Sequence, residues 1–94
     1  MISVTFHIPG ALRAFTGGRD QVEVETTGAT LLDALRALSL SCPAVRDRVL
    51  TEQGQIREHI NIFVGTEDVR YTGGLATTIS SGTEITIVPA VSGG

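Results

Sequence analysis

Residues 30–40 read TLLDALRALSL, and within this segment the apolar pattern of the chain changes from strand-like to helical. Leucines recur at i, i+4 and i+7 from residue 31, a spacing that puts them on one helix face. Thr30 stands at the N-cap position, and Asp33, three residues later, is an acidic near-match to a capping box. The sequence therefore predicts one main helix with one buried face.

Two alternating segments precede this helix. Residues 2–8, ISVTFHI, put Ile2, Val4, Phe6 and Ile8 on one face, which is the period-2 pattern of a half-buried strand. The second segment, residues 20–26, turns two valines inward in the same way. The residues between them, 11–19, are expected to form a loop or turn around Gly17-Gly18. The two strands should therefore pair as an antiparallel hairpin with an enlarged turn.

After the main helix, residues 43–50 predict a shorter helix with proline in its first turn, and the polar residues 51–58 predict a loop. Further strands are expected at 60–64, 68–71 and 84–88, with one helical or 3₁₀ turn at 75–79. This order predicts an α+β fold in which one main helix packs across a mixed sheet. A ubiquitin-like β-grasp matches it well.

Composition predicts a single packed domain, because 94 residues with 41% hydrophobic content can bury one core. We expect the β-grasp domain to span residues 1–89 and residues 90–94 to form a flexible tail. No apolar run approaches the roughly 18 residues of a membrane span, and the N-terminus lacks the features of a signal peptide. A soluble, cytoplasmic protein is the expectation.

The charged residues are seven arginines and ten acids, with no lysine and a net charge of −3. This balance argues against a nucleic-acid partner, which would need a basic stripe. We expect no membrane partner either. A ubiquitin-type protein that builds chains on itself needs an acceptor lysine, and this chain has none. A genome that favours arginine would produce the same absence.

Cys42, His7 and His59 are the candidates for reactive or metal-binding side chains. Cys42 precedes a predicted helix, where a thiolate is favoured, but a small buried hydrophobe is the alternative that we prefer. The two histidines lack a carboxylate at ligand spacing, so they are read as surface residues and no metal site is expected. No nucleotide-binding loop or catalytic triad pattern is present. The sequence therefore argues against an autonomous enzyme.

Two apolar residues fall on the solvent side of the predicted strands. If Ile60, Ile62 and Val64 point inward, Phe63 points outward, and by the same parity Val88 points outward beside Ala90 and Val91. Such a patch on a small domain often marks a partner surface, although scattered surface hydrophobes are the alternative. We favour the partner surface.

The last six residues, 89–94, read PAVSGG. Gly17-Gly18 and Gly73-Gly74 are explained as turns, whereas Gly93-Gly94 carries the free carboxylate. Five extended residues reach about 17 Å, and glycine lets the backbone pass through a channel where a Cβ would clash. Composition alone leaves a frayed terminus as the simpler interpretation.

Three segments together carry a family resemblance: LRAFTGG at 12–18, EDVRYTGGLATTISSGTEITIVPAVSGG at 67–94, and the terminal Gly93-Gly94. The chain resembles the ubiquitin-like sulfur carriers, the family of the molybdopterin synthase small subunit and the thiamine-pathway carrier. The resemblance covers nearly the whole length. Its last third fits best the actinobacterial carrier that supplies a cysteine synthase.

The resemblance implies a chemistry for the tail. An E1-like enzyme would use ATP to adenylate the carboxylate of Gly94, and a sulfurtransferase would convert it to a thiocarboxylate. A partner synthase would then take the sulfur. Gly94 would carry the sulfur and Gly93 would give it passage, with no cofactor bound to the carrier itself. The partner-binding residues expected from patch and tail are Phe63, Val88, Ala90, Val91 and Ser92.

The resemblance leaves the sulfur acceptor open. A cysteine synthase-like enzyme leads, while the large subunit of molybdopterin synthase and the thiazole or thiosugar synthases are alternatives, and one carrier can serve several. A ubiquitin-like modifier that forms isopeptides on target lysines is a second hypothesis. A plain β-grasp interaction module is the third.

Overall fold

The structure of the chain, a computed structural model, describes residues 1–89. The predicted site residues Ala90, Val91, Ser92, Gly93 and Gly94 lie outside the described residues. In chain order the elements are β1 (Ile2–His7), the 3₁₀ helix η1 (Gly10–Phe15), β2 (Gln21–Thr26), α1 (Leu31–Ser41), α2 (Pro43–Val49), β3 (Ile60–Val64), β4 (Glu67–Asp68), the 3₁₀ helices η2 (Val69–Tyr71) and η3 (Gly74–Ala76), and β5 (Glu84–Pro89).

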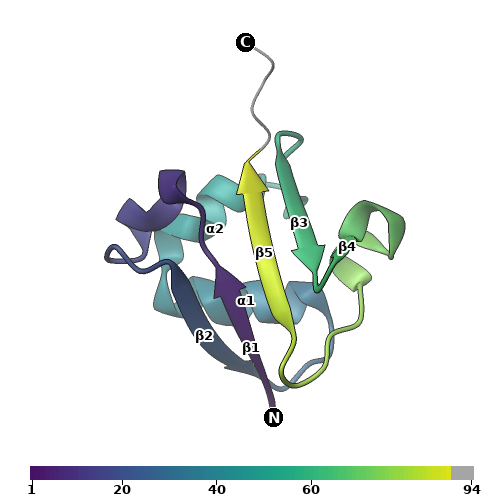
Figure 1. The fold of residues 1–94 in the computed structure, drawn as a ribbon. Coiled ribbons are helices and arrows are strands. Elements are labelled where there is room, and N and C mark those ends of the chain that lie inside the picture. The colour runs from purple at the N-terminus through teal and green to yellow at the C-terminus, as the bar shows by residue number, and fades with distance from the viewer. Residues whose placement is uncertain (90–94) are drawn as a thin grey trace.

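The five strands form one mixed sheet in the order β2-β1-β5-β3-β4 (Figure 1). The first and last strands, β1 and β5, lie side by side in parallel, with Phe6 opposite Ile85. All other pairs are antiparallel, including the β1–β2 hairpin and the pairing of β3 with β5. The main helix α1 crosses one face of this sheet, and the other face stays open. The predicted α+β, β-grasp arrangement is confirmed.

The N-terminus of α1 has the predicted capping box in full. Thr30 Oγ1 accepts a hydrogen bond from the Asp33 backbone N–H at 3.3 Å, and Asp33 Oδ2 accepts one from the Thr30 N–H at 3.2 Å. These bonds satisfy two backbone donors that a helix start would otherwise leave unpaired. The helix buries its predicted face, made of Leu31, Ala34, Leu35 and Leu38, against the sheet.

Strand parity is as the sequence predicts. Val4, Phe6 and Ile8 from the β1 segment point into the core, as do Ile60 and Ile62 of β3. Phe6 is fully buried at the centre, between the hairpin partner Val22 and the β5 residue Ile85. The fixed parity of each strand leaves the alternate side chains on the open face.

Two predictions of local structure are wrong. The strand expected at 68–71 is a two-residue strand, Glu67–Asp68, followed by the 3₁₀ helix η2, because the Asp68 side chain accepts the Arg70 backbone N–H at 2.9 Å and caps a helical turn. The loop expected at 11–19 contains η1, which begins after Pro9 and packs Leu12 into the core. The weak sequence pattern is overridden by a local hydrogen bond at 68–71 and by a core contact at 11–19.

The remaining boundaries shift little. The second helix spans Pro43–Val49 rather than 43–50, and the helical turn expected at 75–79 is the shorter η3. The loop at 51–58 is closed by a single bridge between Leu50 and Ile56. Within residues 1–89, no helix has the length and apolar character needed to cross a membrane.

Candidate functional site

The open side of β3 and β5 carries four neighbouring side chains, which we call the exit face: Asn61, Phe63, Thr86 and Val88. Asn61 lies opposite Val88, and Phe63 lies opposite Thr86. Directly opposed residues of an antiparallel pair share one face of a sheet. Phe63 and Val88 are therefore diagonal neighbours on the face that no helix of residues 1–89 covers.

Exposure agrees with the predicted parity of both apolar residues. Val88 is 37% exposed, and Phe63 is half-buried between Thr86 on one side and Asp68 of β4 on the other. Tyr71 and Leu40 are more exposed, at 87% and 86%, but they lie on η2 and α1. Exposure alone therefore does not single out Phe63 and Val88; their adjacency at the end of β5 does.

Asn61 adds a polar feature to the exit face that the sequence did not reveal. Its Oδ1 atom is buried and, among the described residues, accepts no hydrogen bond. An unpaired buried acceptor costs about 1–3 kcal/mol. Because this atom is buried, it is not itself open to a docked partner.

The exit face continues into a polar strip along β1 and β2. His7 Nε2 lies 2.6 Å from Glu84 Oε1, and His7 stands opposite Thr86 in the parallel pair. Beyond it, Glu23 and Glu25 of β2 are exposed on the same side. The open side of the sheet is thus apolar at its centre and acidic toward its β2 edge.

The C-terminal end of β5 is where the described part of the chain ends. Pro89, the last described residue, pairs with Ile60 at the start of β3. Proline cannot donate a ladder hydrogen bond, so it suits the end of a strand. In Figure 1 this end of β5 lies at the same end of the molecule as α2. The chain therefore continues toward Gly93-Gly94 from a fixed point beside the exit face.

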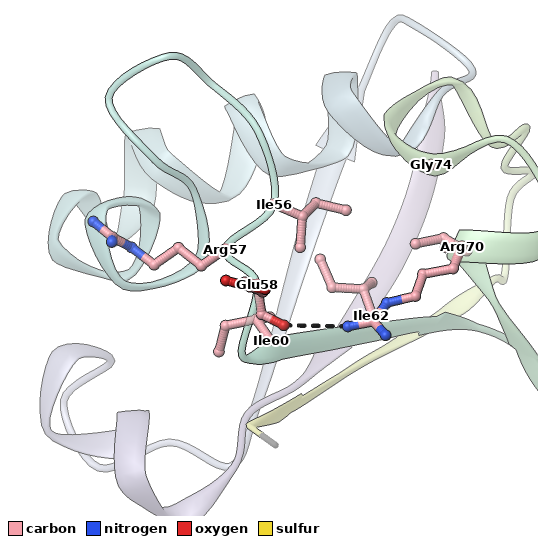
Figure 2. Close-up of a pocket in the computed structure, with 8 residues that line it drawn as sticks. Ile56, Arg57, Glu58, Ile60, Ile62, Arg70 and Gly74 are labelled. Carbon is pink, nitrogen blue, oxygen red and sulfur yellow. Dashed lines mark hydrogen bonds between the residues drawn. The ribbon is translucent and has the colours of Figure 1, made fainter. Parts of the chain in front are cut away.

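A cavity of about 320 Å³ opens on the other side of β3, toward the helices (Figure 2). Its apolar lining consists of Ile56, Ile60, Ile62 and Val69. Arg70 reaches across and donates a hydrogen bond to the Glu58 carbonyl at 3.3 Å, as the dashed line in Figure 2 shows.

The other arginine of this cavity, Arg57, turns its guanidinium away from the apolar side chains (Figure 2). Its Nε donates to the Asp47 carbonyl at 2.9 Å. With Arg70 bonded to a main-chain carbonyl and the Arg57 guanidinium turned away, the cavity offers an apolar hollow and no arrangement of acid, base and nucleophile.

The candidate reactive side chains do not assemble into a site. Cys42 is only 3% exposed between α1 and α2, with Arg19 Nη2 donating toward its Sγ at 3.5 Å, which fits the buried-hydrophobe interpretation. His59 is exposed before β3, far along the chain from the His7–Glu84 pair. Across residues 1–89, no group of three His, Cys, Asp or Glu side chains could hold a metal ion.

The exit face does not by itself show which family the chain belongs to, but comparison with known proteins does. A sequence model of the ThiS family matches residues 6–94. The sulfur carrier protein CysO of Mycobacterium tuberculosis is 40% identical over 95 residues, covering 99% of this chain and all of that protein.

Solved structures agree with the sequence relatives. CysO in the BexX/CysO complex of Amycolatopsis orientalis has a TM-score of 0.86 at 38% identity, covering 97% of this chain and 99% of that one. SAMP1 of Haloferax volcanii, a small archaeal modifier protein, has a TM-score of 0.83 at 32% identity, covering 98% and 99% of the two chains. These similarities extend over the whole described domain.

Proposed function

The chain belongs to the ThiS family and is a sulfur carrier protein, and from this premise we propose that Gly94 bears the sulfur as a C-terminal thiocarboxylate. The observation that carries the proposal is the family match, which runs through both terminal glycines to residue 94. The domain would then serve as a handle that presents the tail to partner enzymes.

The proposed chemistry proceeds in two balanced steps. The Gly94 carboxylate attacks the α-phosphate of ATP, which forms an acyl-adenylate and releases pyrophosphate. Hydrosulfide, delivered by a sulfurtransferase, then attacks the acyl carbon, which forms the C–S bond and breaks the C–O bond to AMP; loss of the S–H proton leaves a thiocarboxylate. Activation is required because a carboxylate is a poor electrophile and oxide a poor leaving group. ATP is thus a substrate of the activating partner rather than a cofactor bound to the carrier.

We propose that the exit face docks these partners. Phe63 and Val88 give an apolar centre beside Pro89, from which the chain continues into residues 90–94. Ordering five tail residues costs roughly 1–2 kcal/mol each, so burial on this face would offset it. Ala90, Val91 and Ser92 would make the further contacts inside the partner, and Gly93 would give the tail passage.

The partners we propose are an E1-like adenylyltransferase with sulfurtransferase activity and a sulfur-accepting synthase. The whole-length similarity to CysO favours a synthase of cysteine biosynthesis. Molybdopterin, thiazole and thiosugar synthases remain the alternatives, and the relative found in complex with BexX supports docking on a second protein. We propose no nucleic-acid or membrane partner. A reaction that consumes ATP favours the cytoplasm as its compartment.

The carrier function is tested by intact mass spectrometry after incubation with the activating enzyme of the same genome, ATP and a sulfide source. We expect the mass to rise by the difference between sulfur and oxygen, only when ATP is present. The proposal would be contradicted if the mass of the carrier stayed unchanged in a reaction in which the enzyme is shown to consume ATP. The acceptor is tested next, by offering the sulfur-loaded carrier to each candidate synthase and analysing the product.

A second candidate function is protein modification, which the similarity to small archaeal modifier protein 1 favours. The same acyl-adenylate would then be attacked by the amine of a target lysine. Affinity capture of a tagged carrier under denaturing conditions separates the two functions, because only modification leaves Gly94 in isopeptide linkage to other proteins.

A further inference from the structure

A second hollow, of about 240 Å³, lies on the surface near the end of β5, and we call it the basic pocket. It is lined by Asp47 and Arg48 of α2 and by Arg57 and His59 of the loop before β3. Neither the family resemblance nor the exit face accounts for this cluster.

The two arginines are held in place by contacts that leave their outer N–H groups available. The Arg48 guanidinium carbon lies 4.7 Å from the centre of the Phe15 ring, a cation–π contact that fixes the side chain against η1. Arg57 is anchored twice, since its backbone N–H donates to Val49 O at 2.9 Å and its Nε to Asp47 O at 2.9 Å. Such arginines lose less conformational entropy on binding than free ones.

The positive charge of the basic pocket is not neutralised within the domain. Among residues 1–89, the two salt bridges are His7–Glu84 and Arg46–Asp47, and neither involves Arg48 or Arg57. The Asp47 carboxylate lies 3.8 Å from Arg46, which takes up part of its charge. The pocket therefore presents two fixed cations and an exposed histidine against one partly paired acid.

The basic pocket flanks the point where the tail leaves. The Ile60 N–H donates to the Arg57 carbonyl at 3.0 Å, and Ile60 pairs with Pro89. Phe15 belongs to η1, which directly follows β1, the parallel neighbour of β5. In Figure 1 both η1 and α2 lie at the end of the molecule where β5 ends. A protein that binds residues 90–94 at this end of the molecule would therefore lie close to the basic pocket.

We propose that the basic pocket receives an aspartate or glutamate side chain from the rim of the activating enzyme's tail channel. This inference rests on the proposed function, because it assigns a docking contact to the enzyme that adenylates Gly94. A carboxylate matches the planar fork of a guanidinium, and both arginines line the same hollow. The Asp47 carboxylate in the wall of the pocket repels bound anions. It repels a dianion such as phosphate more strongly than it repels a single carboxylate.

A contact of this kind acts mainly on association. Complementary charges at the rim of an interface steer the approach of the partner and fix its orientation, and salt weakens the effect. Steering here would align the carrier so that the tail enters the channel first. The acidic β2 edge of the sheet lies away from this end. A partner that approached in the reversed orientation would bring its acidic rim against this acidic edge and would be repelled.

The test compares the double variant Arg48→Gln/Arg57→Gln with the control Arg36→Gln/Arg70→Gln, which removes the same charge from residues that do not line the basic pocket. Association with the activating enzyme is followed by stopped-flow fluorescence at increasing NaCl. At low salt we expect the pocket variant to associate about tenfold more slowly, with a flatter salt dependence, and the control to stay within about twofold of wild type.

Equal association rates for the two double variants would overturn the proposal. So would a change in the backbone resonances of Arg57 and His59 on adding inorganic phosphate at constant ionic strength, since that would make the pocket a free-anion site. Circular dichroism melts verify that all variants fold. The proposed function is read separately, from sulfur uptake by the wild-type carrier, so each inference can fail without the other.

Discussion

Among single residues, Gly94 and Gly93 are those on which the proposed chemistry depends. In the proposed chemistry the reacting carbon belongs to Gly94, and the domain contributes only its presentation. A residue with a side chain at position 94 would place a Cβ next to the reacting carboxylate, where the partner must approach closely. We therefore propose that glycine is required here by the partner's channel and not by the fold of the carrier.

Gly94→Ala is expected to fold as wild type and to lose about a hundredfold in the rate of adenylation, because a small displacement of the reacting group is costly. The measurement is ATP–pyrophosphate exchange by the activating enzyme. Gly10→Ala is the matched control, because an added Cβ there meets no atom within 4 Å. Adenylation of Gly94→Ala at the wild-type rate would refute the narrow-channel argument.

Phe63→Thr tests the exit face at its apolar centre. Threonine is preferred to aspartate because Asp68 lies directly opposite, and two opposed carboxylates would destabilise the sheet. We expect the free energy of unfolding to fall by about 1 kcal/mol or less and partner affinity to fall by about tenfold or more. Tyr71→Thr, which removes an aromatic ring that is 87% exposed on η2, is the control. If both variants bind equally well, the exit face is not the docking surface.

Among the elements, the start of α1 shows how closely local sequence and stability are connected. Gly28 stands beside the capping box, where an added Cβ would clash with Asp33 Oδ2. That oxygen also accepts the Thr30 hydroxyl at 2.7 Å, so it cannot move without breaking the cap. Glycine at position 28 is therefore required by the cap of the helix that follows it.

Gly28→Ala is accordingly expected to lower the free energy of unfolding by about 1 kcal/mol, similar to the loss of an N-cap. Urea denaturation of Gly28→Ala, Thr30→Ala and the double variant measures this. Because both changes disrupt the same hydrogen bonds, the double variant should lose less than the sum of the two. Full additivity would mean that Gly28 acts independently of the cap.

The elements also show which features could be predicted from sequence. The limits of α1, its capping box and the outward parity of Phe63 and Val88 follow from patterns within a few residues, and all were predicted. The strand expected at 68–71 was wrong because an Asp68 side-chain hydrogen bond competes with strand pairing. The basic pocket could not be predicted, since Arg48 meets Phe15 only through the packing of α2 on η1, and Arg57 joins Arg48 only when the loop before β3 packs against α2.

For the molecule as a whole, the order β2-β1-β5-β3-β4 explains how a small domain can present its own C-terminus. The last strand lies at the centre of the sheet, paired on both sides, so the tail begins from a rigid position. The apolar exit face lies on one side of that position and the basic pocket lies at the same end of the molecule. Sequence predicted the strand order only through the β-grasp interpretation, because the parallel β1–β5 pairing joins residues about 80 positions apart.

The central claim, that this carrier bears sulfur on the carboxylate of Gly94, is tested most directly by top-down fragmentation of the protein after reaction with its activating enzyme, ATP and sulfide. We predict that every fragment containing Gly94 gains the sulfur-for-oxygen mass difference and that fragments ending before it, including those containing Cys42, do not. Sulfur found on Cys42 would contradict the account. So would the absence of sulfur from every fragment when the enzyme in the reaction is active.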